Sequence, residues 1–227
     1  VPWFKSMYGY TTDKTLRPAM ATGDFNGDGI VDLAVGDPTY NGNSGRVAVI
    51  TVNTPNRFGS KAPWGANSWE ERQWLYPSSV GLHSGTAHRF GAALAAGELS
   101  DPDHDDLLVG APTAKKTSNS SGKFVIVLQS GGAVIHLPRG KANNAEITWN
   151  PGAPGMFNDY KNFGGSLSIL PGFCEEKGLD TFVVADPGYN GSRGAVHVYQ
   201  CAGNGYGSPS QAELVRTLKG GQEGMEY

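Results

Sequence analysis

A repeat of about 74 residues is the feature that most constrains what this chain can fold into. Nearly the same loop occurs twice, as DPTYNGNSG at 37–45 and as DPGYNGSRG at 186–194. Ala111-Pro112 lies halfway between them, since 74 positions separate Pro38 from Pro112 and 75 separate Pro112 from Pro187. A fixed period of this length indicates one structural unit repeated in tandem. We therefore predict three units, at approximately 16–88, 89–161 and 162–227.

Each unit contains four short segments that are predicted to be β-strands. The first is rich in small residues, the second and third are apolar, and the fourth is more polar. In chain order the segments are 19–22, 33–35, 47–50 and 72–76 in unit 1, 92–95, 107–109, 124–128 and 146–149 in unit 2, and 165–170, 182–184, 195–199 and 213–218 in unit 3. The 33 glycines and 14 prolines, with only 17% charged residues, favour a turn-rich all-β chain over a helical one.

Four strands joined by short turns form an antiparallel meander whose edges and apolar faces need cover. Stacking several such sheets around an axis buries the faces and shortens the exposed edges, which is the β-propeller arrangement. A β-sandwich of the same strands is the alternative, but the regular unit length favours propeller blades. Because closed propellers have more than three blades, we expect an incomplete ring. Its remaining blades would lie elsewhere in a larger protein or come from another chain.

One acidic loop separates the first two strands of unit 1 and has the pattern of a calcium site. It runs DFNGDGIVD from Asp24 to Asp32, and its candidate ligands are Asp24, Asn26, Asp28, the carbonyl of Ile30, and Asp32. Ca²⁺ takes six to eight oxygen ligands, several of them carboxylates, whereas Mg²⁺ tolerates irregular cages poorly. An Asx-rich turn without an ion is the alternative. Three crowded carboxylates would repel one another without a cation, so calcium is favoured.

Two of the three units open with a Phe-Gly pair. RFGAAL at 89–94, leading to VGAP at 109–112, resembles the FG-GAP repeat, and NFGGSL at 162–167 matches the same opening. That repeat builds the N-terminal β-propellers of integrin α subunits. Unit 1 departs from it with Leu16-Arg17, and units 1 and 3 carry Asp-Pro in place of Ala-Pro. The resemblance covers nearly the whole chain. It implies FG-GAP propeller blades, with 24–32 as a structural calcium loop.

The calcium pattern is weaker in the other two units. In unit 2, at 98–106, Glu98 and Ser100 align with the first two ligands but Pro102 falls on the third. Proline has no side-chain oxygen, so a solvated acidic turn is favoured there, although a metal site in another register stays open. The copy in unit 3 has lost the pattern.

Unit 3 also holds both cysteines, and they offer another way to hold its loop. Cys174 follows the first strand and Cys201 follows the third, and in a meander these ends lie at the same edge of the sheet. We predict a disulfide between them, which would indicate an oxidising compartment, with two separate thiols as the alternative. Two sequons, at Asn119 and Asn190, lie in polar stretches, where glycosylation stays an open prediction.

The functional prediction is a non-catalytic, calcium-stabilised, extracellular or cell-surface scaffold that binds a protein or a glycan through its loops. The chain has no nucleophile elbow, phosphate loop or zinc spacing, so no catalytic residue is predicted. A net charge of −3 without a basic face argues against nucleic acid, and no run of 18 apolar residues suggests a membrane span.

Two alternatives to the adhesion scaffold remain open. Glycosylphosphatidylinositol-specific phospholipase D enzymes also carry FG-GAP repeats, and LRPAMATGD at 16–24 looks similar to the opening of their propeller. This chain would then be an accessory region whose catalytic domain lies outside it. A glycan-binding lectin is the third reading, because the long 54–86 connection is rich in Trp and Tyr and either binds a ligand or covers a blade edge.

Overall fold

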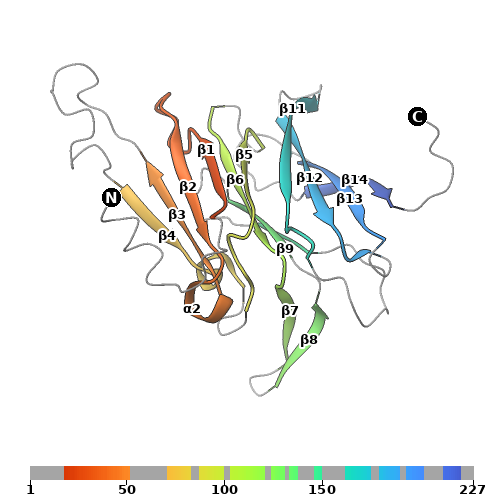
Figure 1. The fold of residues 1–227 in the computed structure, drawn as a ribbon. Helices are drawn as coiled ribbons and strands as arrows, with labels where there is room; N and C mark the ends of the chain where they lie inside the picture. Colours follow the sequence, from red (N-terminus) through yellow and green to blue (C-terminus); the bar gives the residue numbers. More distant parts are fainter. Residues whose placement is uncertain are drawn as a thin grey trace.

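Three four-stranded antiparallel sheets, side by side, make up most of the computed structural model (Figure 1). The model describes residues 18–51, 71–82, 87–99, 103–120, 124–130, 133–137, 146–149, 162–174, 179–189, 193–201 and 212–220. The sheets are open, and no strand pairing among these residues closes them into a ring. The fold is all-β with incomplete FG-GAP propeller blades, as predicted.

Each sheet takes its strands from one predicted unit, although the unit boundaries themselves stay a prediction. The first sheet contains β1 (Met20–Gly23), β2 (Asp32–Asp37), β3 (Arg46–Thr51) and β4 (Glu71–Leu75). The second contains β5 (Leu94–Gly97), β6 (Asp106–Ala111), β9 (Ala133–Leu137) and β10 (Glu146–Trp149). The third contains β11 (Leu167–Cys174), β12 (Leu179–Asp186), β13 (Ala195–Cys201) and β14 (Ala212–Lys219). Two single turns, α2 (Tyr40–Asn43) and η1 (Pro77–Val80), follow β2 and β4.

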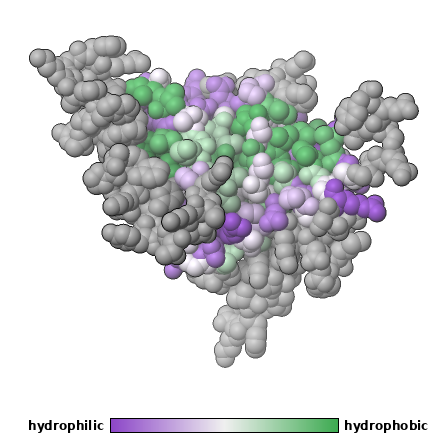
Figure 2. Space-filling view, in the orientation of Figure 1, coloured by the Kyte–Doolittle hydropathy of each residue, from purple (hydrophilic) through white to green (hydrophobic). Residues whose placement is uncertain are grey.

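The first strands of the three sheets converge. β1 contacts β5, and β5 contacts β11, so these are the inner strands of neighbouring blades. Small residues are frequent in β1 and β5, which suits strands that lie against a neighbouring blade, whereas β11 carries larger residues such as Leu167 and Ile169. Figure 2 shows hydrophobic residues gathered across this face, over the region of the inner strands.

The sequence prediction for the third strand of unit 2 was wrong. The predicted segment, 124–128, belongs to β8 (Phe124–Ser130), which pairs with β7 (Lys115–Ser120) in a separate hairpin. This hairpin projects from the three sheets (Figure 1). The third strand is instead β9, which pairs with β6 and β10. Residues 124–128 and 133–137 are both apolar and short enough to be the third strand. Only the pairing with β6 distinguishes them, and this pairing cannot be read from the local sequence.

Two hydrophobic clusters fill the spaces between the sheets. The first joins side chains of units 1 and 2, including Val47, Val49, Phe90 and Val109. The second joins units 2 and 3 and includes Leu108, Phe163, Phe182, Val184 and Tyr199. On β6, Leu107 and Val109 enter the first cluster while Leu108 enters the second. Alternation along one strand therefore supplies both junctions, because successive side chains point to opposite faces.

The Phe-Gly openings bring the backbones of neighbouring units together. Phe90 and Phe163 are 0% exposed, so each is a fully buried anchor. The glycine that follows each of them places its carbonyl against a glycine of the preceding unit: a Cβ on Gly36 would overlap Gly91 O, and one on Gly110 would overlap Gly164 O. The short Phe-Gly pair thus serves as an inter-blade contact.

Candidate metal loop and blade junctions

Asp24 organises the acidic loop between β1 and β2. Its Oδ1 accepts hydrogen bonds from the backbone N–H of Gly27 at 2.7 Å and of Asp28 at 3.1 Å, and its Oδ2 accepts one from Gly29 N–H at 2.7 Å. Gly27 and Gly29 have φ of 73° and 78°, in the left-handed region that glycine adopts at little cost. These glycines let the chain curl back so that three donors point at one carboxylate.

The other predicted ligands hold the rest of the loop. Asn26 Oδ1 accepts the N–H of Asp28 at 3.1 Å, and its Nδ2 donates to Asp28 Oδ2 at 3.2 Å. Asp28 Oδ1 accepts the N–H of Ile30 at 2.8 Å. Asp32 is buried and its Oδ2 accepts the N–H of Phe25 at 3.1 Å. All five predicted residues therefore lie in one compact loop, with Asn26 and Asp28 at its exposed side.

The donor chemistry of this loop fits calcium, although its carboxylates are not gathered into a metal cage. Three carboxylates, one amide and one backbone carbonyl form an all-oxygen set of the kind hard cations take. In the part of the chain that the structure describes, no three His, Cys, Asp or Glu side chains are grouped closely enough to hold a metal ion. Binding would therefore require the carboxylates of the loop to draw closer together than they are here.

Unit 2 contacts this loop through Asp105. The Oδ2 of Asp105 accepts the N–H of Asp24 at 2.7 Å, and the N–H of Asp105 donates to Asp24 O at 3.0 Å. A Cβ on Gly23 would lie 2.8 Å from the Cβ of Asp105, so glycine is needed for this approach. His104 packs against Gly27, where an added Cβ would overlap its ring. The candidate metal loop is thus built partly from the neighbouring unit.

The same pair of hydrogen bonds recurs between units 2 and 3. The Oδ2 of Asp180 accepts the N–H of Glu98 at 3.0 Å, and Asp180 N–H donates to Glu98 O at 2.7 Å. A Cβ on Gly97 would lie 2.6 Å from Asp180 Oδ2. Burial raises the pKa of the Glu98 carboxyl, and the nearby carboxylates of Asp180, Asp105 and Asp103 raise it further. We call each reciprocal pair of bonds an aspartate clasp.

Sequence reasoning missed the clasps, although the repeat carried a signal for them. Asp105 comes directly before Asp106, which pairs with Gly97, the fourth residue of β5. Asp180 comes directly before Thr181, which pairs with Leu170, the fourth residue of β11. The two aspartates therefore hold the same position in successive units. A metal site in another register stayed open for 98–106, the segment that contains His104 and Asp105. For that second site, 100–102 lie outside the described residues, while Glu98 and Asp105 take part in clasps.

The cysteines and sequons are placed by the backbone alone or not at all. Cys174 pairs with Leu179 on one side of β12, and Cys201 ends β13 on the other side. With strands about 4.8 Å apart, two strands flanking a third are about 10 Å apart, beyond the usual disulfide range of 4.4–6.8 Å between Cα atoms. A disulfide would require the strand ends to bend together, and it stays a prediction. Asn119 lies in β7, and Asn190 lies outside the described residues.

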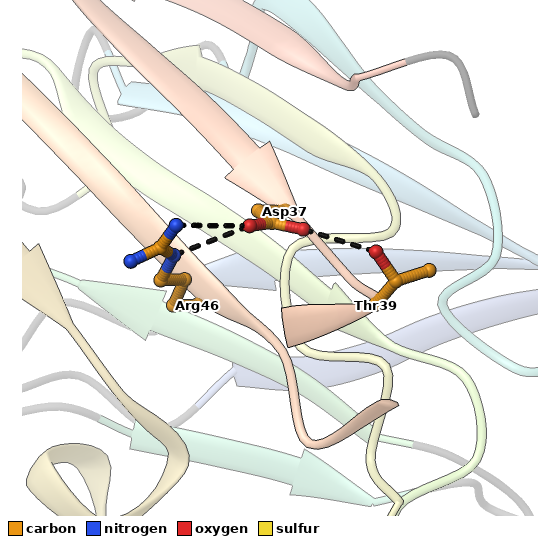
Figure 3. Close-up of polar contacts among 3 residues, drawn as sticks. All are labelled: Asp37, Thr39 and Arg46. Carbon is orange, nitrogen blue, oxygen red and sulfur yellow. Dashed lines mark hydrogen bonds and ion pairs between the residues drawn. The ribbon is translucent and has the colours of Figure 1, made fainter. Parts of the chain in front are cut away.

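The Asp-Pro loop of unit 1 is braced by ionic and aromatic contacts. Asp37 Oδ2 accepts a hydrogen bond from Arg46 Nε at 3.2 Å and forms an ion pair with Arg46 Nη2, also at 3.2 Å, and its Oδ1 accepts a hydrogen bond from Thr39 Oγ1 at 3.1 Å (Figure 3). The Arg46 guanidinium also stacks over Tyr40 at 4.0 Å and over Trp74 at 4.2 Å. Trp74 belongs to the aromatic 54–86 connection considered for ligand binding, and its ring contacts Arg46 of its own sheet.

In unit 3 the equivalent aspartate meets a histidine instead. Asp186 Oδ2 lies 3.3 Å from His197 Nε2, and His197 Nδ1 lies 3.0 Å from Thr217 Oγ1. Asp186 and His197 are almost fully buried. Burial, together with the Asp186 carboxylate, raises the pKa of the neighbouring Tyr199 phenol. This group lies against Phe163, with the Phe163 and His197 ring centroids 5.7 Å apart, so it supports the phenylalanine that unit 3 contributes to the second cluster.

Comparison with known proteins supports the relationship indicated by the Phe-Gly openings. The model of the FG-GAP repeat family matches residues 17–50. The chain is 29% identical to integrin alpha-PS2 of Drosophila melanogaster over 199 residues, which is 87% of this chain and 12% of that protein. It is 27% identical to integrin alpha-V of Gallus gallus over 216 residues, 92% of this chain and 17% of that protein. It is 24% identical to integrin alpha-D of Homo sapiens over 214 residues, 92% of this chain and 15% of that protein.

The chain thus spans between 12% and 17% of the length of these integrin relatives. The family match falls on β1, the acidic loop, β2 and β3, which is the unit that departs from the Phe-Gly opening. None of the helices in the described residues is long and apolar enough to cross a membrane. The first unit matches the FG-GAP repeat, nearly the whole length of the chain is similar to integrin α subunits, and the described strands form open sheets of the kind found in the blades of an integrin-type FG-GAP propeller.

Proposed function

We propose that this chain is part of a calcium-stabilised, extracellular or cell-surface adhesion propeller, which contacts a protein or glycan ligand through its loops and carries no catalysis of its own. The observation that carries the proposal is the Asp24–Asp32 loop. It presents an all-oxygen donor set at a blade junction, within the residues that match the FG-GAP repeat. The similarity to integrin α subunits favours adhesion over the phospholipase-accessory and lectin alternatives.

The role proposed for calcium is structural. The loop links an inner strand, β1, to the central strand β2, and it also contacts unit 2 through the clasp. An ion bound to Asp24, Asn26, Asp28, Asp32 and the Ile30 carbonyl would neutralise the clustered carboxylates and fix the link between the two strands. Calcium would then stabilise both the first blade and its junction with the second.

A further blade is proposed to cover the outer face of unit 3. Val196 on β13 pairs with Ala185 on β12, and Val47 on β3 pairs with Gly36 on β2. Ala185 and Gly36 each precede the last residue of their strand, so Val196 and Val47 hold the same position in their units. Val47 is 0% exposed against unit 2, whereas Val196 is 38% exposed. Leu218, which pairs with Val196, is exposed as well. An apolar face that is buried in one unit and open in another supports a blade packed behind unit 3.

Isothermal titration with calcium tests the proposed metal role. The wild-type chain, stripped of metal, should bind one Ca²⁺, and the Asp28→Ala variant should bind far more weakly because it loses one carboxylate ligand. Asp103→Ala removes an exposed carboxylate of unit 2 outside the loop, so it is a matched control and should bind like the wild type. A wild-type chain that takes up no calcium would refute the calcium role.

Adhesion is tested separately from metal binding. The chain, extended by whatever blades complete the ring, should bind immobilised extracellular matrix proteins or cell-surface glycans, and the binding should weaken when calcium is chelated. Binding to neither class of surface, by a protein that is folded and calcium-loaded, would contradict the adhesion role.

A further inference from the structure

We propose that Asp105 is a positioning residue for the Asp24–Asp32 loop: from unit 2 it holds the main chain of the first calcium ligand, so that calcium and the junction of units 1 and 2 stabilise each other. The inference rests on the proposed calcium role. It adds a residue outside the loop, from another unit, to the set that determines calcium affinity.

The hydrogen bonds of Asp24 support this role. Its N–H donates to the Asp105 carboxylate at 2.7 Å and its carbonyl accepts the Asp105 N–H at 3.0 Å, so both polar groups of its main chain are tied to unit 2. Its own carboxylate accepts the N–H groups of Gly27, Asp28 and Gly29. The residue that shapes the loop is therefore itself placed by Asp105.

Steric fit confines Asp105 to this position. The Asp105 Cβ and Oδ2 occupy the space beside Gly23, where an added Cβ would lie 2.8 Å and 2.9 Å from them. Its neighbour His104 packs against Gly27 on the other side of Asp24. Two consecutive residues of unit 2 thus contact the loop at the positions that flank its first ligands.

Linkage gives the energetic consequence. If Asp105 raises calcium affinity by some factor, bound calcium must strengthen the Asp105 contact by the same factor, because the coupling free energy between two events is reciprocal. Residues that orient metal ligands without touching the metal typically change affinity by about 10- to 100-fold when removed. Asp105 should fall within that range if it acts through Asp24.

The second clasp supplies a matched control. Asp180 makes the same two bonds to Glu98, at 3.0 and 2.7 Å, and also fills the space beside a glycine. The loop that follows Glu98 carries Pro102 at the third ligand position and so lacks the intact calcium pattern. Removing Asp180 should therefore weaken a junction by a similar amount without reaching the calcium site.

The test measures calcium affinity by titration, and thermal unfolding with and without calcium, for Asp105→Ala, Asp105→Asn, Gly23→Ala and Asp180→Ala. Asp105→Ala should lose about 10-fold or more in affinity. Asp105→Asn keeps an acceptor oxygen for the Asp24 N–H and should recover most of that loss. Gly23→Ala displaces the Asp105 side chain without altering it and should weaken binding too. Asp180→Ala should lower the unfolding temperature equally with and without calcium, at unchanged affinity.

Three outcomes would overturn the inference. Wild-type affinity in a folded Asp105→Ala or Gly23→Ala variant would show that Asp105 does not position the ligand. An equal loss of affinity in Asp180→Ala would show a general effect of weakened junctions. A wild-type chain that binds no calcium would refute the proposed metal role as well. That result is distinct from wild-type affinity in the variants, because there both the wild type and the variants bind calcium.

Discussion

The two blade junctions share one design but differ in the acidic loop that lies at each of them. At each junction, the later unit opens with a buried phenylalanine, the carbonyl of the glycine that follows it lies against a glycine of the earlier unit, and an aspartate clasp joins the two units. At the first junction the clasp holds a loop with a full set of calcium ligands, and at the second it holds a loop interrupted by Pro102. The comparison indicates that the clasp is a feature of the repeat itself, and that unit 1 combines it with the proposed calcium loop.

The two loops also differ in how their charge is balanced. At the second junction, burial raises the pKa of Glu98, and the charges of Asp180, Asp105 and Asp103 raise it further. At the first junction the carboxylates of Asp24 and Asp28 are surrounded by backbone N–H donors. The carboxylates of the first loop are thus held by backbone hydrogen bonds, whereas the second loop holds a carboxyl whose pKa is raised by burial and by neighbouring carboxylates.

The largest effects should come from the phenylalanine anchors. Phe90→Ala and Phe163→Ala should each reduce the free energy of unfolding by about 3–5 kcal/mol, because each removes a fully buried aromatic ring from an inter-blade cluster. Urea unfolding followed by tryptophan fluorescence measures both. If one variant lost less than about 1 kcal/mol while the other lost the full amount, the two junctions would not share a common packing.

The glycine contacts should have the next largest effect. Gly36→Ala and Gly110→Ala should each cost about 1–3 kcal/mol, because the new methyl group would meet a backbone carbonyl, which cannot rotate away. The same position in unit 3 is Ala185, where the described residues include no following blade. Thermal unfolding of the two variants would sharpen the comparison, and wild-type stability in either would refute the close approach at that junction.

The smallest effect concerns pH at the second junction alone. Because the pKa of Glu98 is raised in the folded state, its ionised form costs stability above the raised value, and this cost disappears once both states are protonated, below about pH 4. Glu98→Gln should therefore have a free energy of unfolding at pH 7 that is higher than that of the wild type by less than about 1 kcal/mol, because solvent partly screens this half-buried carboxyl. The difference should vanish near pH 4, and a variant less stable than wild type at pH 7 would contradict the raised pKa.

The sequence predicted those features that local patterns specify. Alternation of Gly with Asp and Asn marked the 24–32 loop, and the repeat period marked the blades, because both are written in consecutive residues. The clasps were missed because an aspartate next to a decayed metal motif looks like part of that motif, and only its contact with Asp24, 81 positions away, reveals another role. The third strand of unit 2 was misplaced for a similar reason, since pairing between distant segments decided between two comparable apolar runs.

Amide hydrogen exchange with and without calcium tests the central claim most directly, because it observes both clasps in one sample. Calcium should slow exchange at the amides of Asp24 and Asp105, which form the first clasp, and at Gly27 and Gly29 within the loop. The amides of Glu98 and Asp180 should exchange at the same rate in both conditions. Unchanged exchange at Asp24 and Asp105 in the presence of calcium, or equal slowing at both clasps, would contradict the account.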